Sequence, residues 1–157
     1  MSLDLVKAHL AKYQMEDQII ILENSTATVE LAAQALHTTP AQIAKTLSFM
    51  GKDTALLLVC AGDCRIDNHA FKSTFGVKAK MLKPEEVERY TNHTIGGVCP
   101  FAVPETTLIY LDESLRRFSS IYPACGSANS AISITIDQLE SVVPNVSWVN
   151  VCKGKEE

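Results

Sequence analysis

The segment from Ile95 to Phe101, Ile-Gly-Gly-Val-Cys-Pro-Phe, carries the residues best suited to hold a reacting group. Gly96 and Gly97 lack a Cβ, so their backbone N–H groups can approach a ligand closely. Pro100 fixes the chain directly after them. A loop of this kind can bind an oxyanion, a phosphate or a carbonyl oxygen with main-chain donors. Because Gly-Gly also occurs in plain turns, the interpretation depends on residues elsewhere in the chain.

Lys45 is the cation best placed to act together with that loop. It follows the apolar pair Ile43 and Ala44 and precedes a predicted buried strand. A lysine with apolar neighbours can adopt one of two arrangements. Its aliphatic chain packs along apolar surface while the amine stays in water, or the amine points into a cleft. In a cleft, its ammonium group would bind a phosphate or a carboxylate as a point charge. The local residues support both interpretations.

Cysteine and histidine side chains suggest two further sites. A Cys99 nucleophile activated by His93 would need an orienting third group, and none lies at a recognisable spacing, so the alternative is that Cys99 packs beneath the loop. Cys60, Cys64 and His69 do not match a zinc site, because their spacing is loose and no second ligand pair follows. We expect Cys60 in the core, where free cysteine is common.

The charged residues give weaker signals. Asp112 and Glu113 follow a predicted strand, but adjacent side chains do not face each other, so we expect a solvated turn and no acid–base pair. The densest basic stretch is either a solvated face or a shallow seat for the end of a nucleic acid; it comprises Lys72, Lys78, Lys80 and Lys83. The chain contains neither of the glycine-rich nucleotide motifs, G-x-x-x-x-G-K-[ST] and G-x-G-x-x-G.

The composition bounds the class of protein. The chain has 157 residues, 46% of them hydrophobic and 20% charged, which is typical of a single globular domain. Its formal net charge of −4 argues against a broad nucleic-acid surface, although a local basic patch is compatible with it. No apolar run is long enough to span a bilayer, and no secretory signal opens the chain. The five scattered cysteines then predict reduced thiols in the cytoplasm.

Hydrophobic periodicity and capping residues predict the elements that must position these side chains. Helices are expected at 3–13, at 29–36 with Thr26 or Thr28 near its cap, from Thr39-Pro-Ala-Gln42, at 67–75 ending at Gly76, from Lys83-Pro-Glu-Glu86, and after the capping box Thr135-Ile-Asp-Gln138. Strands are expected at 18–23, at 46–50 and 54–61 as a hairpin, and at 77–82, 107–111, 119–122, 131–135 and 146–151.

This order of elements mixes hairpins with helical crossovers. It predicts an α/β fold with a mixed sheet surrounded by helices, and no regular doubly wound sheet. We expect one domain over residues 1–152. The short polar end, residues 153–157, is predicted to be a disordered tail.

Three motifs occur along the chain in one order, and together they resemble the YbaK/EbsC family of aminoacyl-tRNA deacylases. These deacylases are relatives of the editing domain inserted in bacterial prolyl-tRNA synthetases. The resemblance covers nearly the whole chain, from residue 3 to residue 150. The motifs are Ile43-Ala-Lys-Thr-Leu47, Ile95–Phe101, and Ile121-Tyr-Pro-Ala-Cys-Gly-Ser127 leading into Asn129, with further likeness at Thr28–Ala33 and Ile134–Leu139.

The resemblance implies a compact domain on a curved mixed sheet that hydrolyses the ester joining a wrong amino acid to tRNA, in support of translation fidelity. It implies that Lys45 is required for activity and engages the terminal phosphate region of the tRNA. No metal or cofactor is implied, and attack is assisted by the substrate's own thiol or ribose hydroxyl. The residues that the resemblance places in the amino-acid pocket are Gly96, Gly97, Val98, Cys99, Pro100, Phe101, Gly126, Ser127 and Asn129.

The substrate expected from the resemblance is the acceptor end of an aminoacyl-tRNA, with a small amino acid such as cysteine or alanine on tRNA-Pro. Loop residues such as Val98, Cys99 and Phe101 would then select by size. Prolyl-tRNA synthetase is a candidate partner, and a monomer or weak homo-oligomer is expected. Two other functions compete with this one: a non-catalytic module of the same fold that binds tRNA ends or a synthetase, and a hydrolase that uses Cys99.

The chain departs from the cysteine-specific members of the family at several positions. Those members carry a tyrosine after the first strand, where this chain has Glu23. They also carry a basic residue and an aspartate after the last strand turn, near Ala128 and Ala131 here. The glycine that closes the loop is Ala102 in this chain. Retention of Lys45 and both loop glycines favours catalysis all the same.

Overall fold

The computed structural model describes residues 2–154 of the chain. Six strands form its main sheet: β2 (Ile43–Met50), β3 (Ala55–Ala61), β5 (Leu108–Asp112), β6 (Ser120–Pro123), β8 (Ile134–Thr135) and β9 (Ser147–Val149). Their order is β8-β6-β2-β3-β5-β9. β2 and β3 are an antiparallel hairpin, β6 runs parallel to β2, β5 and β9 continue from β3 in parallel, and β8 is antiparallel to β6. The predicted α/β class with a curved mixed sheet is confirmed.

Two small antiparallel sheets join segments that are far apart in the sequence. β1 (Ile19–Ile21) pairs with β7 (Ser130–Ile132), and β4 (Cys64–Ile66) pairs with β10 (Cys152–Gly154). Lys153 and Gly154, which the sequence placed at the start of the disordered tail, are instead strand residues of β10. They pair with Arg65 and Cys64 of β4. The remainder of that tail, residues 155–157, lies outside the described residues.

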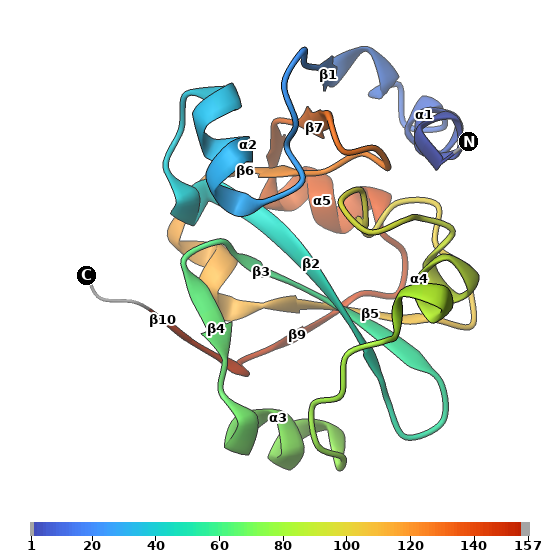
Figure 1. The fold of residues 1–157 in the computed structure, drawn as a ribbon, viewed down its shortest axis with the longest axis vertical. Helices are drawn as coiled ribbons and strands as arrows, with labels where there is room; N and C mark the ends of the chain where they lie inside the picture. Colours follow the sequence, from blue (N-terminus) through green and yellow to red (C-terminus); the bar gives the residue numbers. More distant parts are fainter. Residues whose placement is uncertain (1, 155–157) are drawn as a thin grey trace.

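Helices cover both faces of the sheet. Their bounds are α1 (Ser2–Ala11), α2 (Val29–Leu36), α3 (Asn68–Phe75), α4 (Pro84–Thr91) and α5 (Ile136–Val142). α1 and α5 contribute Val6 and Leu139 to the largest core cluster, whereas α3 packs Phe71 against Phe49 in a second cluster. Figure 1 shows α3 at the opposite end of the molecule from α1 and α2. All seven residues of β3 are buried, as expected for a central strand with both faces covered.

Several elements form as their local residues predict. Thr28 caps α2 by accepting a hydrogen bond from the Leu31 N–H at 3.1 Å. Gly76 ends α3 in the left-handed region, at φ +78°. Thr135 and Gln138 exchange the two reciprocal bonds of a capping box at the start of α5.

Two local elements near the hairpin differ in extent from the prediction. The short helix expected from Thr39 is a single 3₁₀ turn, Pro40–Gln42, and β2 begins directly after it. The strand expected at 77–82 is reduced to one bridge, between Met81 and Phe49. Strand pairing explains both differences. Residues 43–45 pair with β6 and β3 and therefore belong to β2. Because β2 ends at Met50, little of its edge is left for residues 77–82 to pair with.

Two further predictions failed in the second half of the chain. The strand expected at 131–135 divides into β7 and β8, which belong to different sheets. Asp112, expected in a solvated turn, is 1% exposed. Its carboxylate accepts hydrogen bonds from the backbone N–H of Ser114 at 2.9 Å and of Val151 at 2.8 Å, and these bonds account for its burial.

Candidate active site

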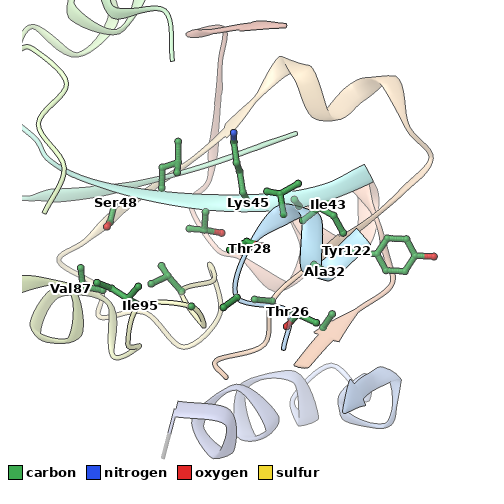
Figure 2. A pocket seen from close by; sticks show the side chains of 18 of the residues that line it. Thr26, Thr28, Ala32, Ile43, Lys45, Ser48, Val87, Ile95 and Tyr122 are labelled. Carbon is green, nitrogen blue, oxygen red and sulfur yellow. The ribbon is translucent and has the colours of Figure 1, made fainter. Parts of the chain in front are cut away.

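A cavity of about 360 Å³ lies beside the middle of β2. Figure 2 shows its wall, with side chains from the segment before α2, from β2, from α4 and from the loop at Ile95. Ile95 and Met81 are 65% and 55% exposed, so these two apolar side chains lie at its mouth. The residues that line it are 26–29, Ala32, 43–48, Met81, Leu82, Val87, Ile95, Gly96, Val98, Tyr122, Ala124, Ser130 and Ala131.

The cavity exists because one edge of β2 is only partly paired. β6 pairs with β2 at Ile43 and Ala44. The next partner along that edge is the segment around Met81, where the Leu82 N–H donates to the Ser48 carbonyl at 3.1 Å. Between these two partners, among residues 2–154, no strand pairs with the 45–47 stretch on this edge. The opening in the ladder leaves the middle of β2 as one wall of the cavity.

The two glycine loops singled out from the sequence are in backbone contact. A Cβ on Gly97 would lie 2.6 Å from the Gly126 carbonyl carbon and 2.7 Å from the Ser127 nitrogen, so no larger residue fits there. Gly97 also donates its N–H to the Thr94 carbonyl at 3.0 Å, and this main-chain donor is therefore already used. Gly96, at φ +96°, is the glycine that lines the cavity.

The downstream loop supports the cavity wall from behind. Asn129 donates its side-chain amide to the Leu22 carbonyl at 3.0 Å, and the Ala128 carbonyl accepts from the Thr26 N–H at 2.6 Å. Ser127 donates to Asn129 Oδ1 at 2.9 Å or to Ser130 Oγ at 2.7 Å. Gly126, Ser127 and Asn129 do not themselves line the cavity. They hold the segment that places Thr26 in the wall.

Three residues of the upstream loop lie away from the cavity. Cys99 and Phe101 are fully buried in the main core, and Pro100 lines a separate hollow near His9. Val98 does line the cavity. The side chains of Cys99 and Phe101 thus anchor the loop from below.

The Cys99–His93 pair lacks the properties of a nucleophile and its base. The Cys99 Sγ lies 3.4 Å from His93 Nε2, but burial raises the pKa of the Cys99 thiol to about 12. His93 Nε2 donates its proton to the Phe101 carbonyl at 2.7 Å, so in this tautomer it cannot accept the thiol proton. His93 is itself fully buried, and burial lowers its pKa.

Lys45 borders the cavity with its stem and turns its amine away. Successive side chains of a strand point to opposite faces, so Lys45 lies on the other face of β2 from Thr46 and Ser48. Figure 2 shows Lys45 extending to the opposite side of β2 from Ser48. Its Nζ donates a hydrogen bond to the Cys64 carbonyl.

The cavity wall is apolar with a few hydroxyl groups. Within the part of the chain that the structure describes, its lining contains no carboxylate, imidazole or thiol. The described residues also contain no group of three or more His, Cys, Asp and Glu side chains that could hold a metal ion. Sequence reasoning missed Thr26 and Thr46 as wall residues, since the first looked like a helix cap and the second like an ordinary strand residue.

The family model for the aminoacyl-tRNA editing domain matches residues 23–142. The chain belongs to this family. The match contains the cavity wall from Thr26 to Ala131, so the site described above lies inside the editing domain.

Three relatives place this editing domain among known proteins. It is 46% identical to the uncharacterized protein YwhH of Bacillus subtilis (strain 168), over 99% of this chain and all of YwhH. A solved structure described as a candidate trans-editing enzyme for prolyl tRNA synthetase superposes with a TM-score of 0.87, at 28% identity and 98% coverage of both chains. The proline–tRNA ligase of Geobacillus sp. (strain WCH70) is 27% identical over 64% of this chain, which corresponds to 18% of the ligase.

None of the described helices has the length and apolar character needed to cross a membrane.

Proposed function

We propose that this editing domain is a trans-acting hydrolase that removes a small, wrongly attached amino acid from tRNA. In the reaction, a water oxygen attacks the carbonyl carbon of the aminoacyl ester. The bond from that carbon to the ribose oxygen breaks, which releases the free amino acid and a tRNA with its hydroxyl restored. The observation that carries the proposal is the cavity between β2 and the Gly96 loop, which lies inside the editing domain and has an open mouth.

The chemistry of the wall supports substrate-assisted attack. The described lining offers no carboxylate, imidazole or thiol that could act as a general base. An activated ester needs little catalytic machinery, so positioning together with a ribose hydroxyl next to the carbonyl can suffice. The backbone of Gly96, held at φ +96° in the wall, is the proposed contact for the developing oxyanion. Val98 bounds the space that the amino acid would fill.

Lys45 is the proposed catalytic cation, and its task is to bind the terminal phosphate region of the tRNA. Its amine now donates to the neutral carbonyl of Cys64. A phosphate oxygen is a stronger acceptor for an ammonium group than a carbonyl is. We therefore propose that the amine exchanges one partner for the other when tRNA binds. Lys80 and Lys83, which flank Met81 at the cavity mouth, extend the basic surface available to the acceptor end.

The proposed substrate is tRNA-Pro carrying a residue such as alanine or cysteine, and the proposed partner is prolyl-tRNA synthetase in the cytoplasm. The two relatives that name this synthetase support the choice. Ala131 lies in the wall and Ala128 next to the Gly96 loop, while Glu23 is exposed and outside the lining. The wall therefore has none of the charged groups of the cysteine-specific members at these positions, which favours alanine over cysteine.

The test is deacylation of tRNA-Pro charged with alanine, cysteine or serine, by the wild type and by Lys45→Ala. We expect release of at least one amino acid, and a loss of at least about 100-fold in kcat/KM for Lys45→Ala with an unchanged circular dichroism spectrum. Lys72→Ala, an exposed lysine on α3, is the matched control and should retain full activity. Equal rates for wild type and Lys45→Ala would refute the role of Lys45.

The same assay separates the competing functions. If the wild type releases no amino acid but binds tRNA, the non-catalytic binding module is correct. A hydrolase that used Cys99 would lose its activity in Cys99→Ala. We expect that variant to keep turnover within about threefold, because the thiol is buried, protonated at neutral pH and outside the cavity.

A further inference from the structure

The amine of Lys45 is held by the backbone that follows β3. Gly62 and Asp63 form the turn between β3 and β4, and the carbonyl of Cys64, the first residue of β4, accepts the hydrogen bond from Lys45 Nζ. A lysine amine lies at the end of a flexible stem, so its position depends on the partner that it bonds. Whatever fixes this turn therefore also fixes the amine.

Arg117 binds the turn through both carboxylate oxygens of Asp63. Its Nη2 donates to Asp63 Oδ1 at 2.5 Å, and its Nη1 donates to Oδ2 at 3.0 Å. The same Nη2 lies 3.7 Å from Cys64 Sγ. A bidentate pair fixes the orientation of both groups as well as their separation. The hydrogen bond from Arg117 lowers the pKa of the Asp63 carboxyl, so the pair stays charged at neutral pH.

Arg117 is in turn fixed by the 3₁₀ helix to which it belongs, Glu113–Arg117. Its Nε donates to the Ser114 carbonyl at 3.0 Å, and Ser114 Oγ accepts the Ala61 N–H at 3.1 Å. This helix thus bonds the chain on both sides of the turn, at Ala61 and at Asp63. The ion pair is the second of these two attachments, and it is the one nearer to the carbonyl that Lys45 uses.

Packing holds the first half of the turn and leaves the second half to the ion pair. A Cβ on Gly62 would lie 2.2 Å from the Pro40 carbonyl oxygen and 2.8 Å from Val29 Cγ1, so Gly62 is tightly enclosed. Cys64 pairs with Gly154 only at the end of the β4–β10 ladder. Ladder ends open at little cost in free energy. Loss of the ion pair should therefore displace the Cys64 carbonyl while Gly62 stays in place.

We propose that Asp63 and Arg117 are positioning residues for Lys45, whose ion pair holds the Cys64 carbonyl where it aligns the amine with the terminal phosphate region of the tRNA. This inference rests on the proposed deacylation. It adds two residues that do not line the cavity and act only through Lys45. Arg117 is not itself the phosphate ligand, because an anion at its guanidinium would lie next to the Asp63 carboxylate.

The pair is also a fair target for substitution. The side chains of Arg117 and Asp63 are 44% and 22% exposed, and ion pairs with this much exposure contribute little to stability. Asp63→Ala and Arg117→Ala should therefore fold, as circular dichroism can verify. Their effect is expected in the rate of deacylation.

The experiment is single-turnover deacylation by Asp63→Ala and Arg117→Ala, each alone and each combined with Lys45→Ala. Alone, each should lower the rate at least about tenfold, since a displacement of about 1 Å can cost that much. Once Lys45→Ala has removed the amine, the same substitutions should change the remaining rate by less than about twofold. Glu113→Ala breaks the neighbouring exposed pair with Arg116, and as the matched control it should keep the wild-type rate.

Two outcomes would overturn the inference. If Arg117 bound the phosphate directly, Asp63→Ala would release the guanidinium and the rate would hold or rise, and Arg117→Lys would keep most of the activity. A positioning role predicts a fall in both variants, because lysine lacks the planar fork that binds both oxygens. Equal losses with and without Lys45 would show that the pair supports the fold in general.

The chemical reactivity of Lys45 gives a readout that needs no deacylation. Reductive methylation, followed by mass spectrometry of the Lys45 peptide, reports how firmly the amine is held. We expect methylation of Lys45 to be faster in Asp63→Ala and Arg117→Ala than in the wild type and Glu113→Ala, with exposed Lys72 unchanged throughout. If the wild type hydrolyses no ester, the proposed function fails, and this comparison still decides whether the pair positions Lys45. Unchanged methylation in both variants would refute that role.

Discussion

At the scale of single residues, the surroundings of Gly97 leave no room for a side chain. Its Cβ position is 2.6 Å from a backbone carbon of Gly126, and a backbone atom cannot swing aside as a flexible side chain can. Gly97 and its neighbour therefore have different tasks: Gly97 allows two loops to touch, and Gly96 adopts the positive φ that brings backbone to the cavity. The contact between the loops is what sets the shape of the cavity wall.

We predict that Gly97→Ala separates the two loops. The expected result is a loss of about 1–3 kcal/mol in the free energy of unfolding, from overpacking. Deacylation should fall at least about tenfold, since a displacement of about 1 Å in a site can cost far more. Urea denaturation and the deacylation assay measure the two effects. Gly76→Ala is the control: its φ of +78° makes alanine strained, but nothing lies within 4 Å, so stability should fall while activity stays.

His93 gives a prediction about pH. Burial lowers its pKa, so in the folded protein the imidazole stays neutral at pH values where the unfolded chain is already protonated. The unfolded state then binds more protons below about pH 6.5, and stability falls as the pH decreases from that value towards the lowered pKa. Above about pH 6.5 this contribution is complete.

The measurement is the free energy of unfolding between about pH 7.5 and pH 5.5. The wild type should lose stability across this window, and His93→Gln should lose less, although it starts from a lower value because His93 bonds the Phe101 carbonyl. His69→Gln removes an exposed histidine and should follow the wild type. Parallel curves for the wild type and His93→Gln would contradict the assignment.

At the scale of elements, a hydrogen bond from the end of β5 holds the C-terminal part of the chain in place. Asp112 caps the short 3₁₀ helix Glu113–Arg117 and also accepts a hydrogen bond from the backbone N–H of Val151, just before β10. One carboxylate thus connects the central sheet to the last strands. Because β10 pairs with β4, this connection reaches Cys64 of β4, whose carbonyl accepts the hydrogen bond from Lys45.

We predict that Asp112→Ala lowers the free energy of unfolding by about 2–4 kcal/mol, because it leaves the buried N–H of Val151 and the partly buried N–H of Ser114 without acceptors. The neighbouring Glu113→Ala is the control. Glu113 forms an exposed ion pair with Arg116 at 2.8 Å, and pairs of this kind contribute about 0–1 kcal/mol. Urea denaturation of the two variants checks the difference, and equal losses would contradict a structural role for Asp112.

At the scale of the whole molecule, net charge limits how tRNA can bind. The chain carries a formal charge of −4, so a broad contact with the phosphate backbone is unfavourable. Lys45 lines the cavity, and Lys80 and Lys83 lie on either side of the lining pair Met81-Leu82. Contact confined to the acceptor end follows from this distribution.

We predict a weak salt dependence of deacylation. With two or three phosphate contacts, kcat/KM at low substrate concentration should fall by about 10- to 40-fold between 50 and 200 mM salt, whereas six to ten contacts would cost about 10³–10⁵. Steady-state kinetics across that range, with subsaturating tRNA, measures the slope. A steep slope would indicate a contact surface that extends well beyond the acceptor end.

The sequence by itself determined the features that depend on near neighbours. Thr28, Gly76 and the Thr135–Gln138 pair set the ends of their helices, and the spacing of apolar residues predicted the β2–β3 hairpin and the α/β class. These signals are local, because a cap or a turn needs only residues within one helical turn of it. The order of three motifs was enough to suggest the family.

Only the tertiary structure decided the features that depend on distant partners. The early start of β2, the unpaired stretch that opens the cavity and the burial of Asp112 each follow from strands or loops far away in the sequence. The same holds for the candidate site: Gly97 contacts Gly126, Cys99 lies in the core, and Thr26 and Thr46 line one cavity. Strand pairing and burial are long-range interactions, and they override local preference where the two conflict.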